Sequence, residues 1–506
     1  MHKQYSFAMK LEPLTHLNAG DRILVGGNQF VTIDAALAAD FETGDSVLVA
    51  DGELVHITRS DSELAADAVD QAAKAFEQLG SITDDAITEF FVEFARLLES
   101  AEAFGPVGAA NAKDVATAQQ RGRSTTRLVL SDTMRADMVE GLRAWAQAPS
   151  GRGDVVEHHA HSGWEVSLVR AGLGVVGFVF EGRPNVFADA CGVLRSGNTV
   201  VFRIGSDALG TAQAIVEHCL QPALAHAGLP AGSAVLINSA SRGSGAAMFN
   251  NVRLSLAVAR GSGPAVAQLG SIARSAGVAV SLHGTGGAWM VASETADLET
   301  LHGAIVASLD RKVCNTVNTV CIPVSVAESV VPAVLAAAQD AAQRLGTNPK
   351  FHLTESTEPY VGDGWRTVTE IARADGNVAE PQCEPISVDM LGHEWEWEQS
   401  PEITVCVVDN VSHAVSLFNE HAPRFVASLI ASGSEEHEAF FNSIDAPFVG
   451  NGFTRWVDGQ YAFNRPELGL SNWQFGRLFS RGGVLSGDSV FTLRTRVNQT
   501  DPTLSR

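Results

Sequence analysis

Cysteine is scarce in this chain, and its few copies are dispersed. Six cysteines are spread over 506 residues, and no two of them form a Cys-x-x-Cys pair. A disulfide framework or a structural zinc site needs closely spaced cysteines, so this spacing argues against both, and we expect no metal. Most of the thiols should be small buried side chains in a reducing compartment. They are Cys191, Cys219, Cys314, Cys321, Cys383 and Cys406.

Positive charge is also in short supply. The chain has 35 Lys and Arg residues against 58 Asp and Glu residues, which gives a formal net charge of -23. This excess repels a phosphate backbone at long range, so we expect no nucleic-acid partner. No stretch approaches roughly 18 uninterrupted apolar residues, and the N-terminal segment leads into no apolar signal region. We therefore expect a cytoplasmic protein with no membrane partner.

The residues that are present fit a packed globular protein. Apolar residues make up 45% of the chain and charged residues 18%, which excludes wholesale disorder and a fibrous repeat. The length allows about two to four domains. Residues 1–60 stand apart, because short β-rich runs there are separated by glycine-containing breaks, and we predict a small β-rich unit. The runs are Arg22–Val25, Gln29–Ile33, Ser46–Ala50 and Leu54–Thr58.

Helical periodicity begins at Ser60. The clearest helix follows Thr83, a predicted N-cap, with Asp84 and Asp85 in the first turn, where the positive end of the helix dipole favours acids. Apolar residues then recur at the helical period, which predicts one buried face. They are Ile87, Phe90, Phe91, Phe94, Leu97 and Leu98.

Short, wholly apolar runs alternate with longer amphipathic segments between residues 174 and 282. Strands buried on both faces and joined by helices predict an α/β fold with a doubly wound parallel sheet. In the helix after the second run we predict Ser206 as the N-cap, with Gly228 and Pro230 at the end. The predicted strands are Gly174–Phe180, Thr199–Ile204, Ala234–Asn238, Leu254–Ala259 and Val278–Leu282.

A second alternating block, from about residue 289 to 450, predicts another α/β domain. Its predicted strands are Thr319–Pro323, Thr404–Val408 and Phe425–Ala431. The tail alternates from Val490 into Arg494 and Arg496, which predicts a strand. It has no hairpin partner nearby, so it should pair with a distant segment or another subunit.

Cys314 is the strongest candidate nucleophile. The cations Arg311 and Lys312 just upstream would lower the pKa of its thiol, and Asn315 and Thr316 could donate to an oxyanion. The alternative for any such cysteine is a buried structural residue, which is the interpretation we favour for Cys321.

Two strand ends could bind a dinucleotide, because helix N-terminal amides attract phosphate and glycine permits close approach. They are Arg203-Ile204-Gly205-Ser206 and Arg260-Gly261-Ser262-Gly263. Neither is a Gly-x-Gly-x-x-Gly fingerprint, and tight turns would account for the glycines equally well. His283, at the end of another strand, could lie near a reacting carbonyl or be structural. The run from His158 to His161 invites a metal interpretation, but no evident ligand set completes it, and a solvated strand is the better interpretation.

Taken together, these segments resemble the glutamate-5-semialdehyde dehydrogenase family, also called gamma-glutamyl phosphate reductases, of the aldehyde dehydrogenase superfamily. The resemblance spans about residues 65–500, and its motifs occur in the family's order. They are Gly174–Val186, Ser196–Val200, Val313–Asn315, Asn451–Gly459 and Glu467–Ser471.

The resemblance implies two Rossmann-like domains and a cysteine thioester mechanism that uses NADP(H). Residues 61–282 would form the NADP(H)-binding domain, 283–455 the catalytic domain and 456–506 a C-terminal return with an oligomerisation strand. Residues 150–170 would join that strand in an oligomerisation arm, so a homodimer or homotetramer is expected. In this chemistry the Cys314 thiolate attacks an acyl phosphate, phosphate leaves, and NADPH reduces the thioester to an aldehyde.

The resemblance also suggests roles for particular side chains. Arg203, Gly205, Ser206, Arg260, Gly261, Ser262 and Gly263 would hold the dinucleotide. Arg183, Asn185, His283 and Arg455 would bind the substrate, with the two arginines near the leaving phosphate or a substrate carboxylate. Superfamily members that hydrolyse the thioester carry a Glu in a Glu-Leu-Gly-Gly motif. The matching loop here reads Leu282-His283-Gly284-Thr285-Gly286-Gly287, and the missing carboxylate favours reduction over hydrolysis.

The chain departs from the family's pattern around the expected substrate site. Asn318 stands where the family has a Glu, Trp289 lies near the position of a second His, and 472–483 replaces the family's Thr and His-Ala-Arg-Gly-Pro. The substrate could therefore be gamma-glutamyl phosphate or a modified or carrier-attached relative. Two alternatives stay open. One is a catalytically silent, partner-binding homologue. The other is an NAD-dependent hydrolytic enzyme in which Glu396 or Glu398 resembles the acid that contacts nicotinamide ribose.

Overall fold

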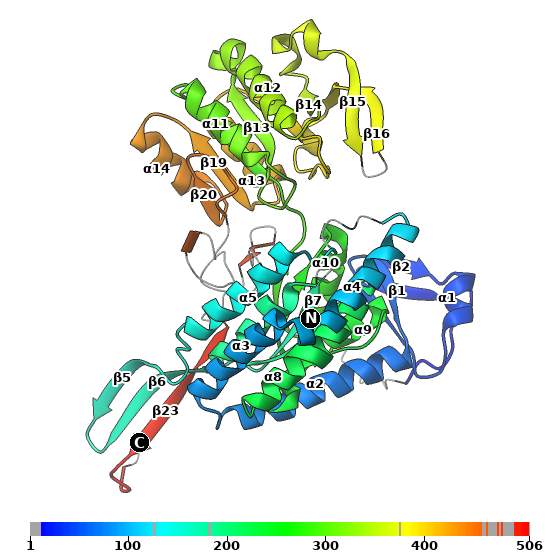
Figure 1. Cartoon of the computed structure of the whole chain (residues 1–506), viewed down its shortest axis with the longest axis vertical. Helices are drawn as coiled ribbons and strands as arrows, with labels where there is room; N and C mark the ends of the chain where they lie inside the picture. Colours follow the sequence, from blue (N-terminus) through cyan, green and yellow to red (C-terminus); the bar gives the residue numbers. More distant parts are fainter. Residues whose placement is uncertain are drawn as a thin grey trace, which may run out of the picture.

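The computed structural model describes residues 12–123, 125, 128–180, 184–373, 376–457, 462–463, 473–474, 477–478 and 490–504. Two lobes, each built on a parallel sheet covered by helices, lie along the long axis (Figure 1). A three-stranded antiparallel arm and a small N-terminal unit extend from the first lobe. This is the α/β architecture, with two parallel sheets and an arm, that the sequence predicts.

The first lobe is built on a five-stranded sheet with the order β11-β10-β7-β8-β9, and every pairing is parallel. Along the chain, β7 is followed by β8 and β9 on one side of it and then by β10 and β11 on its other side. At such a reversal the carboxyl ends of β7 and β10 frame the crevice in which doubly wound sheets bind ligands. The strands are β7 (Val175–Phe180), β8 (Thr199–Ile204), β9 (Ala234–Leu236), β10 (Leu254–Arg260) and β11 (Ala279–His283).

Helices cover both faces of this sheet. Thr83 caps α3 by accepting a hydrogen bond from the Ala86 N–H, and the apolar face predicted for this helix is buried. One face is covered by α2 (Arg59–Leu79), α9 (Arg242–Phe249) and α10 (Gly263–Ser275). The other is covered by α3 (Asp84–Glu99), α4 (Ala101–Gln120), α5 (Asp132–Gln147), α7 (Leu209–Ile215) and α8 (Gln221–His226).

The predicted N-cap at Ser206 is wrong. Ser206 is the first residue of a short 3-10 turn, η2 (Ser206–Ala208), and α7 begins at Leu209. The Gly205 N–H donates to the Phe180 carbonyl at the end of β7, and the Ala208 N–H donates back to Gly205. These bonds hold the backbone at residues 205–208 against the end of the sheet. The chain therefore forms a 3-10 turn before the α-helix begins. At the other end, Gly228 has the positive φ of 70° expected after a helix, and Pro230 follows.

The second lobe is built on a seven-stranded sheet with the order β17-β14-β18-β13-β12-β19-β20, again all parallel. Its strands are β12 (Ala288–Ala292), β13 (Val317–Pro323), β14 (Lys350–Thr354), β17 (Cys383–Ile386), β18 (Glu402–Val408), β19 (Val426–Ile430) and β20 (Phe448–Gly450). Its helices are α11 (Leu298–Ser308) and α12 (Ala327–Arg344) on one face, and α13 (Val411–His421) and α14 (Ser434–Ser443) on the other. A hairpin, β15 (Val368–Arg373) and β16 (Gly376–Pro381), lies beyond β14.

One helical stretch in the described part of the chain, Val324–Arg344, is long and apolar enough by composition to cross a membrane. Its side chains at Val330, Val331, Val334 and Leu335 are buried in the core of the second lobe. The stretch is apolar because it is a helix of the protein core.

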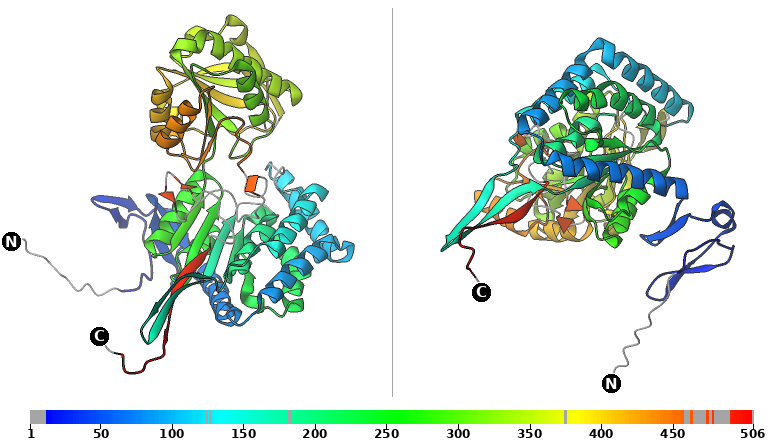
Figure 2. Two further views of the ribbon diagram at one scale, coloured as in Figure 1. Left: turned by 90° about the vertical axis from the view of Figure 1, so that its left-hand side faces the viewer. Right: turned by 90° about the horizontal axis from the view of Figure 1, so that it is seen from below.

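The arm contains the C-terminal strand. β23 (Phe491–Gln499) pairs antiparallel with β6 (Trp164–Gly172), which also pairs with β5 (Val155–His161), and Figure 2 shows the three strands reaching away from the lobe. The distant partner predicted for the tail is therefore the segment near residue 170. Gly172 lies where the arm meets the lobe, and a Cβ there would come within 2.2 Å of the Gly197 carbonyl oxygen.

The N-terminal unit consists of two hairpins joined by a short helix. β1 (Arg22–Gly26) pairs with β2 (Gln29–Thr32), and β3 (Ser46–Ala50) pairs with β4 (Glu53–Ile57), as the sequence predicts; α1 (Ala35–Asp40) lies between the hairpins. The second hairpin packs through Ala50 and Ile57 on the helices α9 and α10 of the first lobe. The unit is therefore anchored beside the predicted dinucleotide edge.

Candidate active site

Cys314 lies in a tight turn directly before β13. The Thr316 N–H donates to the Val313 carbonyl at 3.0 Å, and the Thr316 hydroxyl donates to the Arg311 carbonyl at 2.7 Å. The same hydroxyl oxygen accepts from the Val313 N–H at 2.9 Å. Because β13 is fixed between β12 and β18, this turn holds a partly exposed Cys314 at the amino-terminal edge of the sheet.

The loop of residues 284–287 forms a wall directly against Cys314. A Cβ placed on Gly286 would lie 2.6 Å from the Cys314 Cα and 2.8 Å from its Cβ, so only glycine permits this approach. The Gly287 N–H donates to the Cys314 carbonyl at 2.7 Å, and Gly287 has a φ of +99°. The loop that resembles the family's Glu-Leu-Gly-Gly motif is therefore in contact with the candidate nucleophile.

The other side of this loop lies on the predicted dinucleotide edge. A Cβ on Gly284 would come within 2.9 Å of the Gly263 Cα, and one on Gly263 within 2.4 Å of the Thr285 Oγ1. The Gly261 N–H donates to the His283 carbonyl at 3.3 Å. Since Gly263 is the first residue of α10, the helix N-terminus after β10 and the turn of Cys314 are separated only by the 284–287 loop.

The two predicted cofactor arginines are held by protein oxygens. Arg203, which is largely buried, donates to the carbonyls of Ala240 and Ser241 at 3.2 and 3.0 Å. Arg260 donates to the carbonyl of Ser281 at 2.9 Å and to its own neighbour Ala259 at the same distance. These contacts shape the strand ends. The backbone at Gly205 and Ser206 and at Gly261–Gly263 is better placed than either guanidinium to approach a dinucleotide phosphate.

Asn315 and Arg455 form hydrogen bonds that stabilise the turn of Cys314. The buried Asn315 amide donates to the Val457 carbonyl at 2.8 Å, and its oxygen accepts a close hydrogen bond from Arg455. Arg455 also pairs with Asp310, with 2.7 Å between its Nε and the Asp310 Oδ1. In this structure both side chains support the turn, and their predicted roles toward an oxyanion or an anion stay predictions.

The remaining predicted substrate residues lie at the same edge or outside the described residues. Asn185 follows β7 and precedes α6 (Val186–Ala190), and its Oδ1 is buried with no hydrogen-bond partner among the described residues. His283 ends β11, with its ring centroid 4.8 Å from that of Phe425, whose cluster Cys314 also touches. Arg183 lies outside the described residues.

Lys312 and Glu394 form an ion pair beside the 284–287 loop that touches Cys314. The Glu394 Oε1 lies 2.5 Å from the Lys312 Nζ, and its Oε2 accepts a close hydrogen bond from the Gly286 N–H. A carboxylate therefore reaches the 284–287 loop although the loop's own sequence contains none. Sequence proximity could not reveal this pair because 82 positions separate its members.

Four of the other five cysteines lie in environments that disfavour a thiolate. Burial raises the pKa of Cys191, and it raises the pKa of Cys219 to about 12 and of Cys383 to about 11. Cys321 and Cys406 face each other on β13 and β18 and are both buried. Cys321 is thus the structural residue that the sequence suggests.

The histidine run lies on the exposed strand β5 of the arm. His158 pairs with Ser167, His159 with Glu157, and His161 stacks on Trp164 with ring centroids 4.2 Å apart. Within the described residues no group of three or more His, Cys, Asp and Glu side chains is arranged to hold a metal ion.

Comparisons with known proteins agree with this architecture. The aldehyde dehydrogenase family model matches residues 47–354, more than half of the chain. A gamma-glutamyl phosphate reductase of Rhizobium johnstonii is 29% identical over 380 residues, covering 74% of this chain and 81% of the relative. One from Brucella anthropi is 27% identical over 394 residues, covering 76% and 84%.

Solved structures show the same fold. The crystal structure of gamma-glutamyl phosphate reductase from Thermotoga maritima matches with a TM-score of 0.74 at 22% identity, covering 87% of this chain and all of that one. An acetylating aldehyde dehydrogenase from Geobacillus thermoglucosidasius matches with a TM-score of 0.59 at 14% identity, covering 88% and 99%. With two parallel sheets, a cysteine turn between them and these relatives, the chain belongs to the aldehyde dehydrogenase family.

Proposed function

We propose that this protein reduces an activated carboxyl group to an aldehyde through a thioester on Cys314. The substrate class is an acyl phosphate, either gamma-glutamyl phosphate or a modified or carrier-attached relative, and the reductant is NADPH. The observation that carries the proposal is the contact of Gly286 with Cys314 on one side and of Gly284 with Gly263 on the other. This places a partly exposed thiol one loop away from the helix terminus expected to hold the dinucleotide. The names of the curated relatives support the same reaction.

The residues at the first sheet fit a nicotinamide dinucleotide. Gly261, Ser262 and Gly263 lead from β10 into α10, a helix of 13 residues, beside the end of the central strand β7. Small residues let a pyrophosphate approach the helix N-terminus, whose amides attract it. A bound NADPH supplies the hydride that converts the thioester to an aldehyde.

The chain's own residues carry out the acyl transfer. The Cys314 thiolate attacks the acyl carbon, a C–S bond forms, and the C–O bond to phosphate breaks, which leaves inorganic phosphate and a thioester. Asn185, at the end of β7, and backbone N–H groups of the Cys314 turn are the proposed donors to the oxyanion. Once the acyl carbon has been reduced, the Cys314 sulfur would leave, which would break the C–S bond and restore the thiolate.

Among the residues that the structure describes, no carboxylate near Cys314 is placed as a free base, which favours reduction over hydrolysis. Glu394 is the acid that reaches the 284–287 loop, and it is occupied by the Lys312 ammonium and the Gly286 N–H. Both partners bind the ionised carboxylate and use its lone pairs. A thioester on Cys314 would therefore meet no activated water from this acid.

Cys314→Ala tests the proposal. With NADPH and gamma-glutamyl phosphate or another acyl phosphate, we expect the variant to lose at least about 1000-fold in turnover, because only the thiol carries the acyl group. Cys383→Ala is the matched control, since its thiol lies at the far edge of the second sheet, and it should keep wild-type rates. A Cys314→Ala enzyme that still oxidises NADPH with the acyl phosphate would refute the proposal. A wild-type protein that neither binds NADPH nor turns over would favour a silent homologue.

The assembly and location also stay proposals. We infer that 61–282 binds the dinucleotide, that 283–455 is catalytic, and that the arm formed by β5, β6 and β23 joins subunits of a cytoplasmic homodimer or homotetramer. The support is the exposed face of the arm, where Val155, Val156 and Val497 are about half exposed.

A further inference from the structure

A short segment in the connection from β17 to β18 places an acid on the wall of the Cys314 site. Residues 391–398 connect toward β18 and carry Glu394, whose side chain is 13% exposed. One carboxylate oxygen of Glu394 accepts from the Gly286 N–H, and the other lies 2.5 Å from the Lys312 Nζ. The Lys312 side chain is only 5% exposed. Glu394 thus connects Gly286, in the loop that touches Cys314, to Lys312, two positions before Cys314.

The segment is clamped on both sides of Glu394. Asn318, the second residue of β13, donates its amide to the His393 carbonyl at 2.8 Å and accepts from the Trp395 N–H at 2.9 Å. A side chain that bonds both flanking residues fixes the backbone at 394. Asn318 is therefore the residue that sets the position of Glu394.

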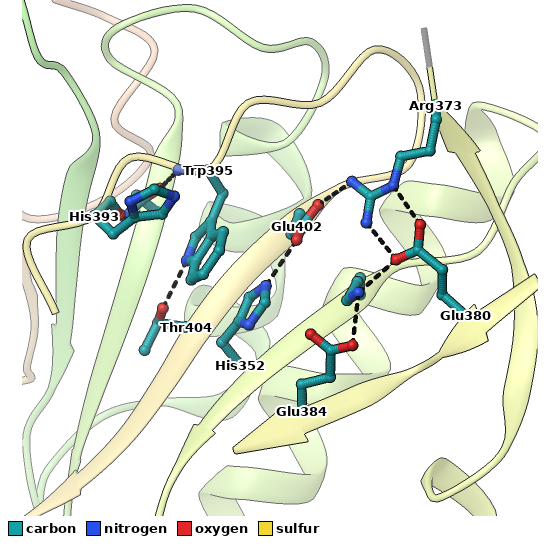
Figure 3. Close-up of polar contacts among 10 residues, drawn as sticks. His352, Arg373, Glu380, Glu384, His393, Trp395, Glu402 and Thr404 are labelled. Carbon is teal, nitrogen blue, oxygen red and sulfur yellow. Dashed lines mark hydrogen bonds and ion pairs between the residues drawn. The ribbon is translucent and has the colours of Figure 1, made fainter. Parts of the chain in front are cut away.

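The Trp395 ring anchors the segment to the sheet, as Figure 3 shows. Its Nε1–H donates to the Thr404 hydroxyl at 2.8 Å, and its ring lies parallel to that of His352, with centroids 3.4 Å apart. His352 is buried and lies 2.7 Å from the Glu402 carboxylate, which also pairs with Arg373 at 2.6 Å. These contacts leave Glu394 little freedom to leave the Cys314 site.

We propose that Glu394 is a positioning residue for Cys314 with two separable roles. Its hydrogen bond to Gly286 holds the 284–287 loop against the cysteine turn. Its charge neutralises Lys312, which would otherwise favour the thiolate form of Cys314. The pair is largely buried, so each charge acts with little solvent screening, and removing one leaves the other uncompensated. The inference rests on the proposed function only in taking Cys314 as the nucleophile.

The other charged groups described near the Cys314 turn are paired elsewhere or exposed to solvent. Arg455 is paired with Asp310, and Arg311 is exposed to solvent. Glu396 lies 4.0 Å from the same ammonium, but its side chain is 69% exposed. His283, at the end of β11, is a further titratable group in the described part of this site. Glu396 therefore provides a matched control for the Glu394 charge.

The test is the pH dependence of Cys314 alkylation by iodoacetamide, measured by peptide mass spectrometry on the full-length protein. In Glu394→Gln the amide oxygen still accepts from Gly286 but the charge is gone, so we expect the midpoint of alkylation to fall by about one pH unit. Lys312→Gln should raise it by a similar amount. The double variant, which has no uncompensated charge, should return to within about 0.3 units of wild type, and Glu396→Gln should match wild type.

The tether is tested separately by turnover. Glu394→Ala loses both charge and acceptor, so kcat should fall about 10-fold or more while KM changes little, whereas Glu394→Gln should stay within about 3-fold of wild type at its own optimal pH. If Glu394→Gln proves unstable, Lys312→Gln carries the comparison, because its alkylation midpoint should rise above that of wild type. Equal midpoints in Glu394→Gln, Glu396→Gln and wild type would overturn the inference. Alkylation needs no acyl phosphate, so this result is independent of whether Cys314→Ala loses activity.

Discussion

At the scale of single residues, the six thiols of this chain differ sharply in their surroundings. Cys314 is partly exposed, whereas Cys191, Cys219, Cys321 and Cys406 are buried, and burial raises the pKa of the partly exposed Cys383 to about 11. A buried neutral thiol is a poor nucleophile, because alkylation requires the thiolate. We therefore expect iodoacetamide at pH 8 to label Cys314 first in the folded protein.

Peptide mass spectrometry over a time course checks this order. In Cys314→Ala the other five cysteines should stay protected until denaturant is added, which is the control for their reactivity in the unfolded chain. Labelling of Cys219 or Cys191 as fast as Cys314 would contradict the burial that the structure assigns to them.

Gly286 makes a second prediction at this scale. In Gly286→Ala the new methyl group would overlap the Cys314 backbone, so either the loop or the cysteine turn must shift. A displacement near 1 Å at a reacting atom costs about 100-fold in rate, and we expect kcat/KM to fall by that order. Gly303→Ala is the matched control, because a Cβ there meets nothing within 4 Å in α11. Wild-type kcat/KM in Gly286→Ala would show that the loop does not press on Cys314.

The sequence could indicate Cys314 but not most of what surrounds it. A cysteine flanked by Lys312 and Asn315 is visible in a few adjacent letters, so local chemistry suggested a nucleophile. The contacts that decide how those neighbours act come from far along the chain: Glu394 neutralises Lys312, and Val457 occupies the amide of Asn315. No local pattern encodes such pairings, because they exist only after both sheets have formed.

At the scale of elements, β23 is the strand whose role can be tested most directly. It is the only neighbour of β6 on one side, since β5 occupies the other. A chain that ends at Val490 would leave the hairpin of β5 and β6, and an isolated hairpin is marginally stable. We expect trypsin or chymotrypsin to cut residues 155–172 at least about 10-fold faster in this variant. Size-exclusion chromatography with light scattering should show a smaller assembly.

A chain that ends at Gln499 keeps β23 and serves as the control. It should match the full-length protein in protease resistance and in mass. Unchanged resistance of residues 155–172 after removal of β23 would mean that the hairpin is held by other contacts.

Which elements the sequence predicts depends on how uniformly each is buried. β7 and β8 are buried along their whole length, so their runs of apolar letters predict strands with nearly correct bounds. β14 is equally buried, yet it carries the polar residues Lys350 and His352 among apolar ones. Its residue pattern therefore does not predict a strand. Its charged side chains find partners on β16 and β18, at Glu380 and Glu402, which a scan along the sequence cannot see.

At the scale of the whole molecule, the candidate active site is assembled where the chain passes from one sheet to the other. β11 ends at His283 and β12 begins at Ala288, so the 284–287 loop is both the connection between the sheets and the wall of the Cys314 site. The alternation of strand and helix predicted two parallel sheets. It does not indicate that the linker itself touches the candidate nucleophile Cys314, because that contact depends on how the two sheets meet.

The charged cluster at the edge of the second sheet should make this lobe sensitive to acid. Arg373 donates two hydrogen bonds to Glu380 and lowers its pKa to about 2; burial opposes this shift, and Lys350 adds to it. The ordinary value is 4.5, so the folded state prefers the ionised form more strongly than the unfolded chain does. The stabilisation is therefore complete above about pH 4.5 and is lost as the pH falls toward 2.

Glu380→Gln tests this sign. At pH 7 we expect the variant to lose about 2 kcal/mol of unfolding free energy, because Arg373 and Lys350 lose a shared charged partner. At pH 3 the difference should shrink, since wild-type Glu380 then contributes less. Urea unfolding at the two pH values measures both numbers, with Glu358→Gln as the control, because that acid forms an exposed pair with Arg366. A loss at pH 3 as large as that at pH 7 would show that the ionised form of Glu380 does not hold the edge of this lobe together.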